Sequence, residues 1–79
     1  MPHYFFHIID DLHTADDEGA ELGDLAAARG HAIASARVLM CETLTQDGRI
    51  NLAHRIDIED EARRVVDSVA FEDAIDIRQ

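Results

Sequence analysis

The sequence predicts an α+β fold: a small antiparallel sheet of three or four strands, in the order β-(β)-α-β-β, with one long helix packed on it. Three segments are typical of strands: residues 3–9 are aromatic and β-branched, residues 55–59 alternate between polar and apolar side chains, and residues 64–71 are predicted as their partner strand. A single uninterrupted stretch rich in alanine, leucine and arginine, residues 25–46, favours a helix. Because the chain has 79 residues, we expect a single domain over residues 1–79.

The first predicted strand, residues 3–9, has apolar side chains on both of its faces. Because side chains alternate along a strand, one face carries Tyr4, Phe6 and Ile8, and the other carries Phe5, His7 and Ile9. We therefore expect an interior strand that is covered at least partly on both sides. A turn at Gly19 and a short second strand at Ala20–Leu22 are predicted to follow it.

The helix is predicted to begin after Asp24, a favourable N-cap residue, and to end before Gly48, which can adopt the left-handed conformation of a helix terminus. Such a helix spans roughly 33 Å, so one end is expected to project beyond the sheet. Its larger apolar side is predicted to cover the sheet and carries Leu25, Ala32, Ile33, Ala36, Leu39, Met40 and Leu44.

The opposite side of the predicted helix is apolar as well, but its residues are small: Ala27, Gly30, Ala34, Val38 and Cys41. Two interpretations remain open. Alanine is tolerated on exposed helix surfaces for its propensity; alternatively, a second copy of the chain or a partner helix lies along this side. Gly30 favours contact, because a mid-helix glycine costs about 1 kcal/mol relative to alanine and close backbone approach offsets that cost.

A hairpin is predicted to complete the sheet, with strands at 55–59 and 64–71 joined by a polar turn. The inward face of the second strand is predicted to carry Val65, Val69 and Phe71. Asp67 is in phase with these residues, which indicates either a β-bulge or a shift that turns Val66 inward instead. The tail, residues 72–79, is expected to dock as a short strand or a turn.

The charge excludes some partners and indicates another. The chain has 7 arginines, no lysine and 17 acidic residues, which gives a net charge of −10. That balance argues against binding to nucleic-acid phosphates or to an anionic membrane surface, both of which need clustered cations. Residues 10–24 contain seven of the acids and no arginine. This loop is interpreted either as a solvated acidic turn or as a docking site for a basic protein, formed by Asp10, Asp11, Asp16, Asp17 and Glu18.

The patterns that carry catalysis or hold a cofactor do not occur in the sequence. Without a nucleophile elbow, a Gly-rich phosphate loop or a zinc-binding spacing, we predict neither an enzyme nor a cofactor. The acidic loop lacks the spacing of an EF-hand. A metal site built from His7, His13 and neighbouring acids is a less favoured alternative. The single cysteine, Cys41, and the lack of a visible signal sequence or membrane span predict a cytoplasmic protein.

The order of several short motifs resembles a bacterial family. The motifs are Pro2-His3-Tyr4-Phe5-Phe6-His7, Asp17-Glu18-Gly19 with Glu21-Leu22, Asp24-Leu25-Ala26-Ala27-Ala28-Arg29, Ile56 and Ile58, Asp60-Glu61, and Phe71-Glu72-Asp73-Ala74 with Ile75. Together they resemble, along essentially the whole chain, the family called domain of unknown function 6894, whose members are mostly short alphaproteobacterial proteins. The chain departs from the family at Ala62-Arg63, where glycine is usual, and at Gly30. The resemblance implies no activity and no catalytic residue.

We therefore expect a small interaction or regulatory module without catalytic activity that self-associates as a homodimer. An alternative comes from a weaker architectural likeness to the antitoxin halves of HicAB-type toxin–antitoxin pairs. That likeness implies an acidic inhibitor of a basic protein. Neither expectation involves nucleic acid, a membrane or a cofactor.

Overall fold

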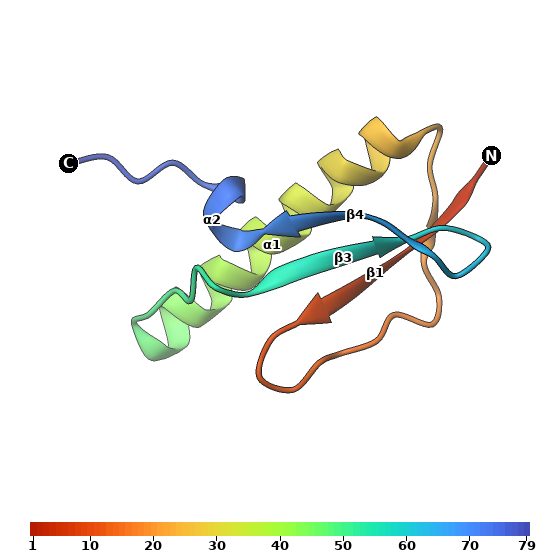
Figure 1. The fold of residues 1–79 in the computed structure, drawn as a ribbon. Helices are drawn as coiled ribbons and strands as arrows, with labels where there is room; N and C mark the ends of the chain where they lie inside the picture. Colours follow the sequence, from red (N-terminus) through yellow and green to blue (C-terminus); the bar gives the residue numbers. More distant parts are fainter.

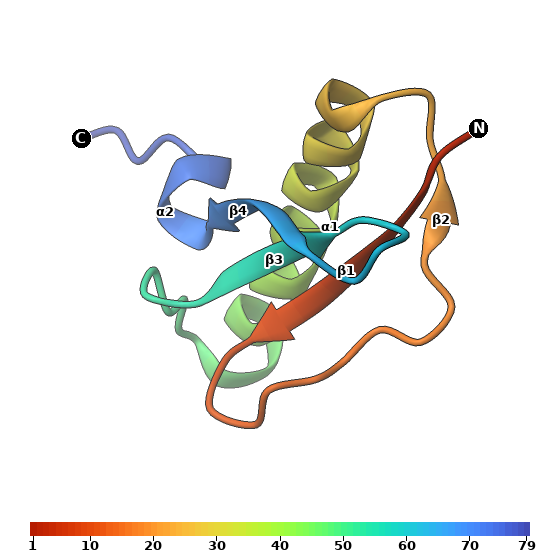
Figure 2. The ribbon, with the colours of Figure 1, turned by 45° about the vertical axis from the view of Figure 1, so that its right-hand side comes forward.

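The computed structural model describes residues 1–79 and shows one antiparallel sheet with a long helix across one of its faces (Figure 1). The elements are β1 (His3–Ile9), β2 (Ala20–Glu21), α1 (Leu25–Asp47), β3 (Arg55–Glu59), β4 (Val65–Ala70) and α2 (Phe71–Ala74). The strands lie in the order β2-β1-β3-β4, so β2 and β4 are the edges. Figure 2 shows β2 beside β1 near the N-terminus. The predicted α+β fold is confirmed.

Helix α1 begins and ends where its capping residues predict. The Asp24 carboxylate accepts a hydrogen bond from the Ala27 backbone N–H at 2.8 Å, which satisfies one of the free donors of the first turn. At the other end Gly48 adopts a φ of 70°, and its N–H donates to the Leu44 carbonyl at 3.0 Å. The helix includes Asp47, one residue more than predicted.

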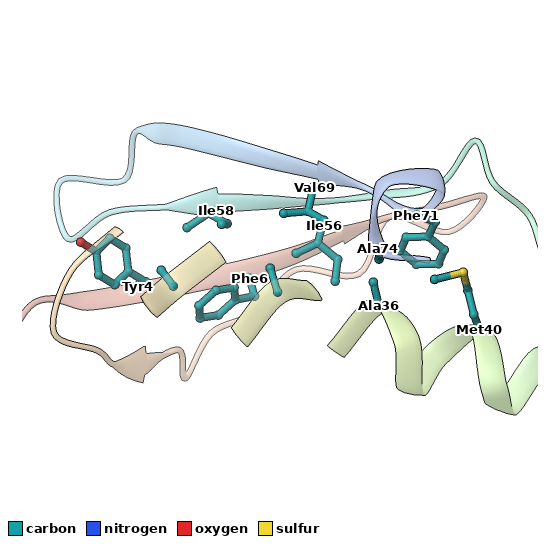
Figure 3. Packing of buried hydrophobic residues seen from close by; sticks show 11 residues of the cluster. Tyr4, Phe6, Ala36, Met40, Ile56, Ile58, Val69, Phe71 and Ala74 are labelled. Atoms are coloured by element: carbon teal, nitrogen blue, oxygen red, sulfur yellow. The ribbon is translucent and has the colours of Figure 1, made fainter. Parts of the chain in front are cut away.

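The core lies between α1 and one face of the sheet and consists of 11 buried residues (Figure 3). The helix contributes mainly small side chains at every fourth position, so its backbone can lie close to the sheet. These residues are Ala28, Ala32 and Ala36, followed by Met40. The strands and α2 contribute Tyr4, Phe6, Ile56, Ile58, Val69, Phe71 and Ala74.

Two leucines of the predicted sheet-facing side of α1 do not reach the core. Leu25 is 38% exposed and Leu44 is 51% exposed. The reason is the length of the helix: its 23 residues span about 35 Å, whereas the 7 residues of β1 span about 23 Å. The first and last turns of α1 therefore extend past the strands. The prediction is therefore wrong for these two leucines, whereas the other five residues of the predicted side are buried or pack against the core.

Strand β1 is interior, as predicted, but α1 lies on only one side of the sheet (Figures 1 and 2). Phe6 on the helix side is buried, whereas Phe5, His7 and Ile9 on the opposite side are half-buried. Side chains rather than a second layer cover this opposite side in part. The Arg63 guanidinium lies 3.8 Å from the centre of the Phe5 ring, which shields one face of the ring from water.

The hairpin of β3 and β4 contains the bulge that the inward phase of Asp67 indicated. Ile58 pairs with Asp67 and the next residue, Glu59, pairs with Val65, which leaves Val66 without a partner. Val66 is 40% exposed, so the alternative in which it turns inward is wrong. Val65 is 59% exposed, so its predicted inward position is wrong as well. Bulges increase local twist, and this one separates the start of β4 from the core.

The turn between β3 and β4 shows what the departure from glycine at Ala62-Arg63 involves. Arg63 adopts a φ of 64°, in the left-handed region that favours glycine. The Arg63 side chain offsets part of the backbone strain, because its Nη1 lies 3.2 Å from the Glu59 Oε1 atom while its guanidinium covers Phe5.

After β4 the chain forms the helical turn α2 instead of continuing as a strand. Phe71, predicted as the last strand residue, is the first residue of α2 and is buried together with Ala74. Arg37 of α1 fastens this turn, because its Nε donates to the Ala74 carbonyl at 2.6 Å. Ile77 is 65% exposed, so the predicted docking of the tail stops at the half-buried Ile75.

Candidate functional site

The acidic loop between β1 and β2 is attached to the edge of β1 at several points. Ile8 and Thr14 exchange two backbone hydrogen bonds, each of 2.8 Å. Farther along, the Leu22 N–H donates to the Pro2 carbonyl at 3.0 Å. The loop therefore follows the strand edge and presents a fixed surface.

Asp16 holds the middle of this loop with its side chain. Its carboxylate accepts backbone hydrogen bonds from Phe6 at 3.0 Å, and from Glu18 and Gly19 at 3.1 Å each. Burial alone would raise the pKa of Asp16. The three backbone donors nevertheless hold this pKa below its usual value. Because its oxygens are engaged within the chain, Asp16 is a positioning residue of the loop.

The His7 ring supports the same loop from the strand side. Its Nδ1 accepts a hydrogen bond from the Asp16 backbone N–H at 3.0 Å, and this acceptor role places the ring proton on Nε2. Nε2 is buried 3.1 Å from the Glu59 Oε2 atom, off the axis of a hydrogen bond. His13 is exposed on the loop. No group of three or more metal-ligating side chains is assembled in the structure.

The other acids of the loop have two different surroundings. Asp17 and Glu18 are exposed and form no ion pair, so their charges face solvent. Asp10 and Asp11 lie at the end of β1, where they line a cavity of about 430 Å³. The structure thus divides the five predicted docking residues into Asp16, which is held by backbone donors through both oxygens, two solvent-facing carboxylates and two at the cavity. Of the last two, Asp10 also accepts the Leu12 and His13 N–H groups through its Oδ1 atom.

The cavity opens between the end of β1, the end of α1 and the segment before β3. Besides the two loop acids, its charged and titratable lining consists of Asp47, Arg49 and His54. The His54 Nε2 atom is buried 3.9 Å from the Asp11 Oδ1 atom, and no hydrogen bond satisfies it. With three carboxylates and one arginine, this lining suits a cationic side chain of a partner.

Sequence reasoning missed the second half of this cavity. Asp47, Arg49 and His54 are distant from the acidic loop in the chain, and no motif joins them to it. The antiparallel register of β1 and β3, in which Ile9 pairs with Arg55, brings the two segments together. Only a prediction of how β1 pairs with β3 could have shown from the sequence that these residues meet the acidic loop.

The outer side of α1 is uncovered, because the sheet lies along only the opposite side of the helix (Figures 1 and 2). All five residues of the predicted self-association face are exposed: Ala27, Gly30, Ala34, Val38 and Cys41. Val38 is 58% exposed, and a methyl group added at Gly30 would meet no atom within 4 Å. Nothing in the single chain therefore accounts for the glycine.

No helix of the structure combines the length and the apolar character needed to cross a membrane. The comparisons with curated proteins and with solved structures found no match. A family profile, described as Domain of unknown function (DUF6894), matches residues 3–72 and so includes every strand and the long helix. The chain therefore belongs to this family of domains of unknown function.

Proposed function

We propose that the protein is a non-catalytic interaction module of the cytoplasm that self-associates through the outer face of α1, defined by Ala27, Gly30, Ala34, Val38 and Cys41. The observation that carries the proposal is that this face is apolar and exposed while the opposite side of the same helix is buried. A helix that is apolar on both sides is usually covered on both sides. The free Cys41 thiol suits a reducing compartment.

The shape of the face favours a second helix as its partner. Small side chains let two helix backbones approach closely, and the face from Ala27 to Cys41 extends about 21 Å along the helix. Close packing at Gly30 would also account for a residue that costs a helix about 1 kcal/mol relative to alanine. A two-fold axis lets the same face serve both copies.

Sedimentation equilibrium at micromolar concentration tests this proposal. We expect a dimer for the parent chain. Ala34→Glu should shift it to monomer by at least tenfold in dissociation constant, because the carboxylate would be buried without a partner. Ala62→Glu, at the exposed hairpin turn, is the matched control and should leave the dimer intact. A parent chain that stays monomeric, or a dimer indifferent to Ala34→Glu, contradicts the proposal.

A second function is favoured by a different observation: Asp17 and Glu18 are exposed and unpaired on the same loop whose first two acids, Asp10 and Asp11, line a cavity together with a third carboxylate, Asp47. Such a surface attracts and orients a basic protein. The function would then be that of an acidic inhibitor covering a cationic partner. Asp16 is excluded from this docking surface because the backbone of its own loop occupies its oxygens.

Purification of the protein from its source cells at low salt, followed by titration of any basic protein recovered, tests this second function. The double variant Asp17→Asn, Glu18→Gln should weaken the recovered complex about tenfold while leaving the fold intact. Glu72→Gln with Asp73→Asn is the control, because it removes the same charge from two exposed positions of α2. Equal affinities for the two double variants would contradict docking at the loop.

A further inference from the structure

Strand β4 is the long free edge of the sheet. It pairs only with β3, whereas the opposite edge, β2, has just 2 residues. A free edge offers unpaired backbone donors and acceptors to any other strand, and proteins protect such edges by specific means. The sequence of β4, Val-Val-Asp-Ser-Val-Ala, contains one charge and two exposed valines, so its composition alone offers little protection.

The ladder identifies which backbone groups of β4 face outward. The Phe71 N–H donates to the His54 carbonyl at 2.9 Å, and bonded pairs alternate along antiparallel strands. Val69 and Asp67 are therefore bonded to β3. Ser68, between them, directs its backbone N–H and carbonyl away from β3 and toward the open edge.

Both outward groups of Ser68 are already satisfied within the chain. The Ser68 N–H donates to the Asp67 Oδ1 atom at 2.8 Å. Arg29 of α1 donates through Nη1 to the Ser68 carbonyl at 3.3 Å and to the Asp67 Oδ2 atom at 3.1 Å. A single ion pair thus occupies both outward backbone groups of Ser68, at the centre of the strand edge.

The two members of this pair are the residues that break the apolar pattern of their own elements. Arg29 lies near the sheet-facing side of α1, and Asp67 occupies an inward position of β4. Their side chains are 41% and 30% exposed, and an ion pair so accessible to water adds little to stability. Stability alone is therefore a weak reason for these residues, whereas satisfaction of the edge is a specific one.

We infer that the Arg29–Asp67 pair closes the free edge of β4 and that without it β4 pairs antiparallel with β4 of a second copy. A second copy is the occupant that the geometry favours, because antiparallel pairing about a two-fold axis places the same strand opposite itself. The surface differs from the outer face of α1, so this inference stands or falls independently of the proposed helix contact.

The test uses Arg29→Met in an Ala34→Glu background, which removes the helix contact from the measurement. Methionine keeps an apolar stem in place of the arginine stem but has no donors. Sedimentation velocity should show self-association at least tenfold tighter than in Ala34→Glu alone. Arg78→Met, which breaks the exposed pair with Asp76 and changes the charge equally, is the control and should have no effect. Equal dissociation constants for Ala34→Glu with and without Arg29→Met would overturn the inference.

Two further variants identify the surface. Asp67→Ala removes both acceptors of the pair from the strand side and should promote association in the same direction, which covers the case in which Arg29→Met does not fold. Adding Val66→Lys to either variant should restore the monomer, because an edge lysine blocks strand pairing. Association that persists with Val66→Lys would place the contact elsewhere and contradict the inference.

Discussion

Asp16 shows how one side chain can replace part of a strand. Beyond the two-residue β2, the edge of β1 has no neighbouring strand, and the Phe6 N–H there would lack a partner. The Asp16 carboxylate fills that place and at the same time binds two backbone donors of its own turn. The turn also depends on Gly19, where an added methyl group would clash with the Tyr4 carbonyl oxygen. The loop is thus shaped by its backbone contacts as much as by its charges.

Replacing Asp16 with Asn should destabilise the protein at neutral pH by about 1–2 kcal/mol, since hydrogen bonds to a charged acceptor are lost. Because the pKa of Asp16 is lowered on folding, its contribution is fully present above the unfolded value of about 3.9 and is lost as the pH falls through the lower folded value. Urea unfolding from pH 7 to pH 3 should therefore show the parent and the variant converging below about pH 4.

Asp17→Asn is the control for this measurement, because Asp17 is adjacent and exposed and has no ion-pair partner. Its stability should stay within about 0.5 kcal/mol of the parent at every pH. A constant difference between Asp16→Asn and the parent across this range would contradict the role given to the carboxylate.

At the scale of elements, features that depend on only a few neighbouring residues were predicted well from the sequence. The cap at Asp24, the left-handed Gly48 and the polar–apolar alternation of β3 each depend on a few residues, so the sequence predicts their positions within about a residue. The bulge was also foreseeable, because Asp67 breaks a two-residue period. In each case the signal and the structure lie in the same short segment.

Features that depend on how elements meet were predicted poorly. The sheet-facing side of α1 was predicted, but how far the helix extends past the strands was not, and this leaves Leu25 and Leu44 exposed while Ala28 is buried. The pairing of Arg29 with Asp67 joins two irregularities that were visible separately but lie far apart in the chain. The second half of the acidic cavity likewise follows from strand register.

At the scale of the whole molecule, the net charge of −10 acts on any assembly the protein forms. The charge is uneven, since the loop carries most of it and α1 is nearly neutral. Two copies brought together along α1 would still repel each other over distances comparable to the width of the domain. A basic partner at the loop would instead be attracted over the same distances.

The two proposed functions therefore predict opposite responses to salt. The Debye length falls from about 10 Å at 0.1 M to about 3 Å at 1 M, so salt weakens both repulsion and attraction. Raising sodium chloride from 0.05 M to 0.5 M should tighten the dimer through α1 several-fold, because apolar burial remains while repulsion is screened. The same change should weaken a complex with a basic partner by tenfold or more. Sedimentation equilibrium measures the response of the dimer, and calorimetry measures that of the complex.

The double variant Asp17→Asn, Glu18→Gln should reduce the salt dependence of partner binding, whereas Ala34→Glu should not. A dimer that loosens with salt would show that ion pairs hold the copies together and would contradict assignment of the contact to the small apolar residues of α1.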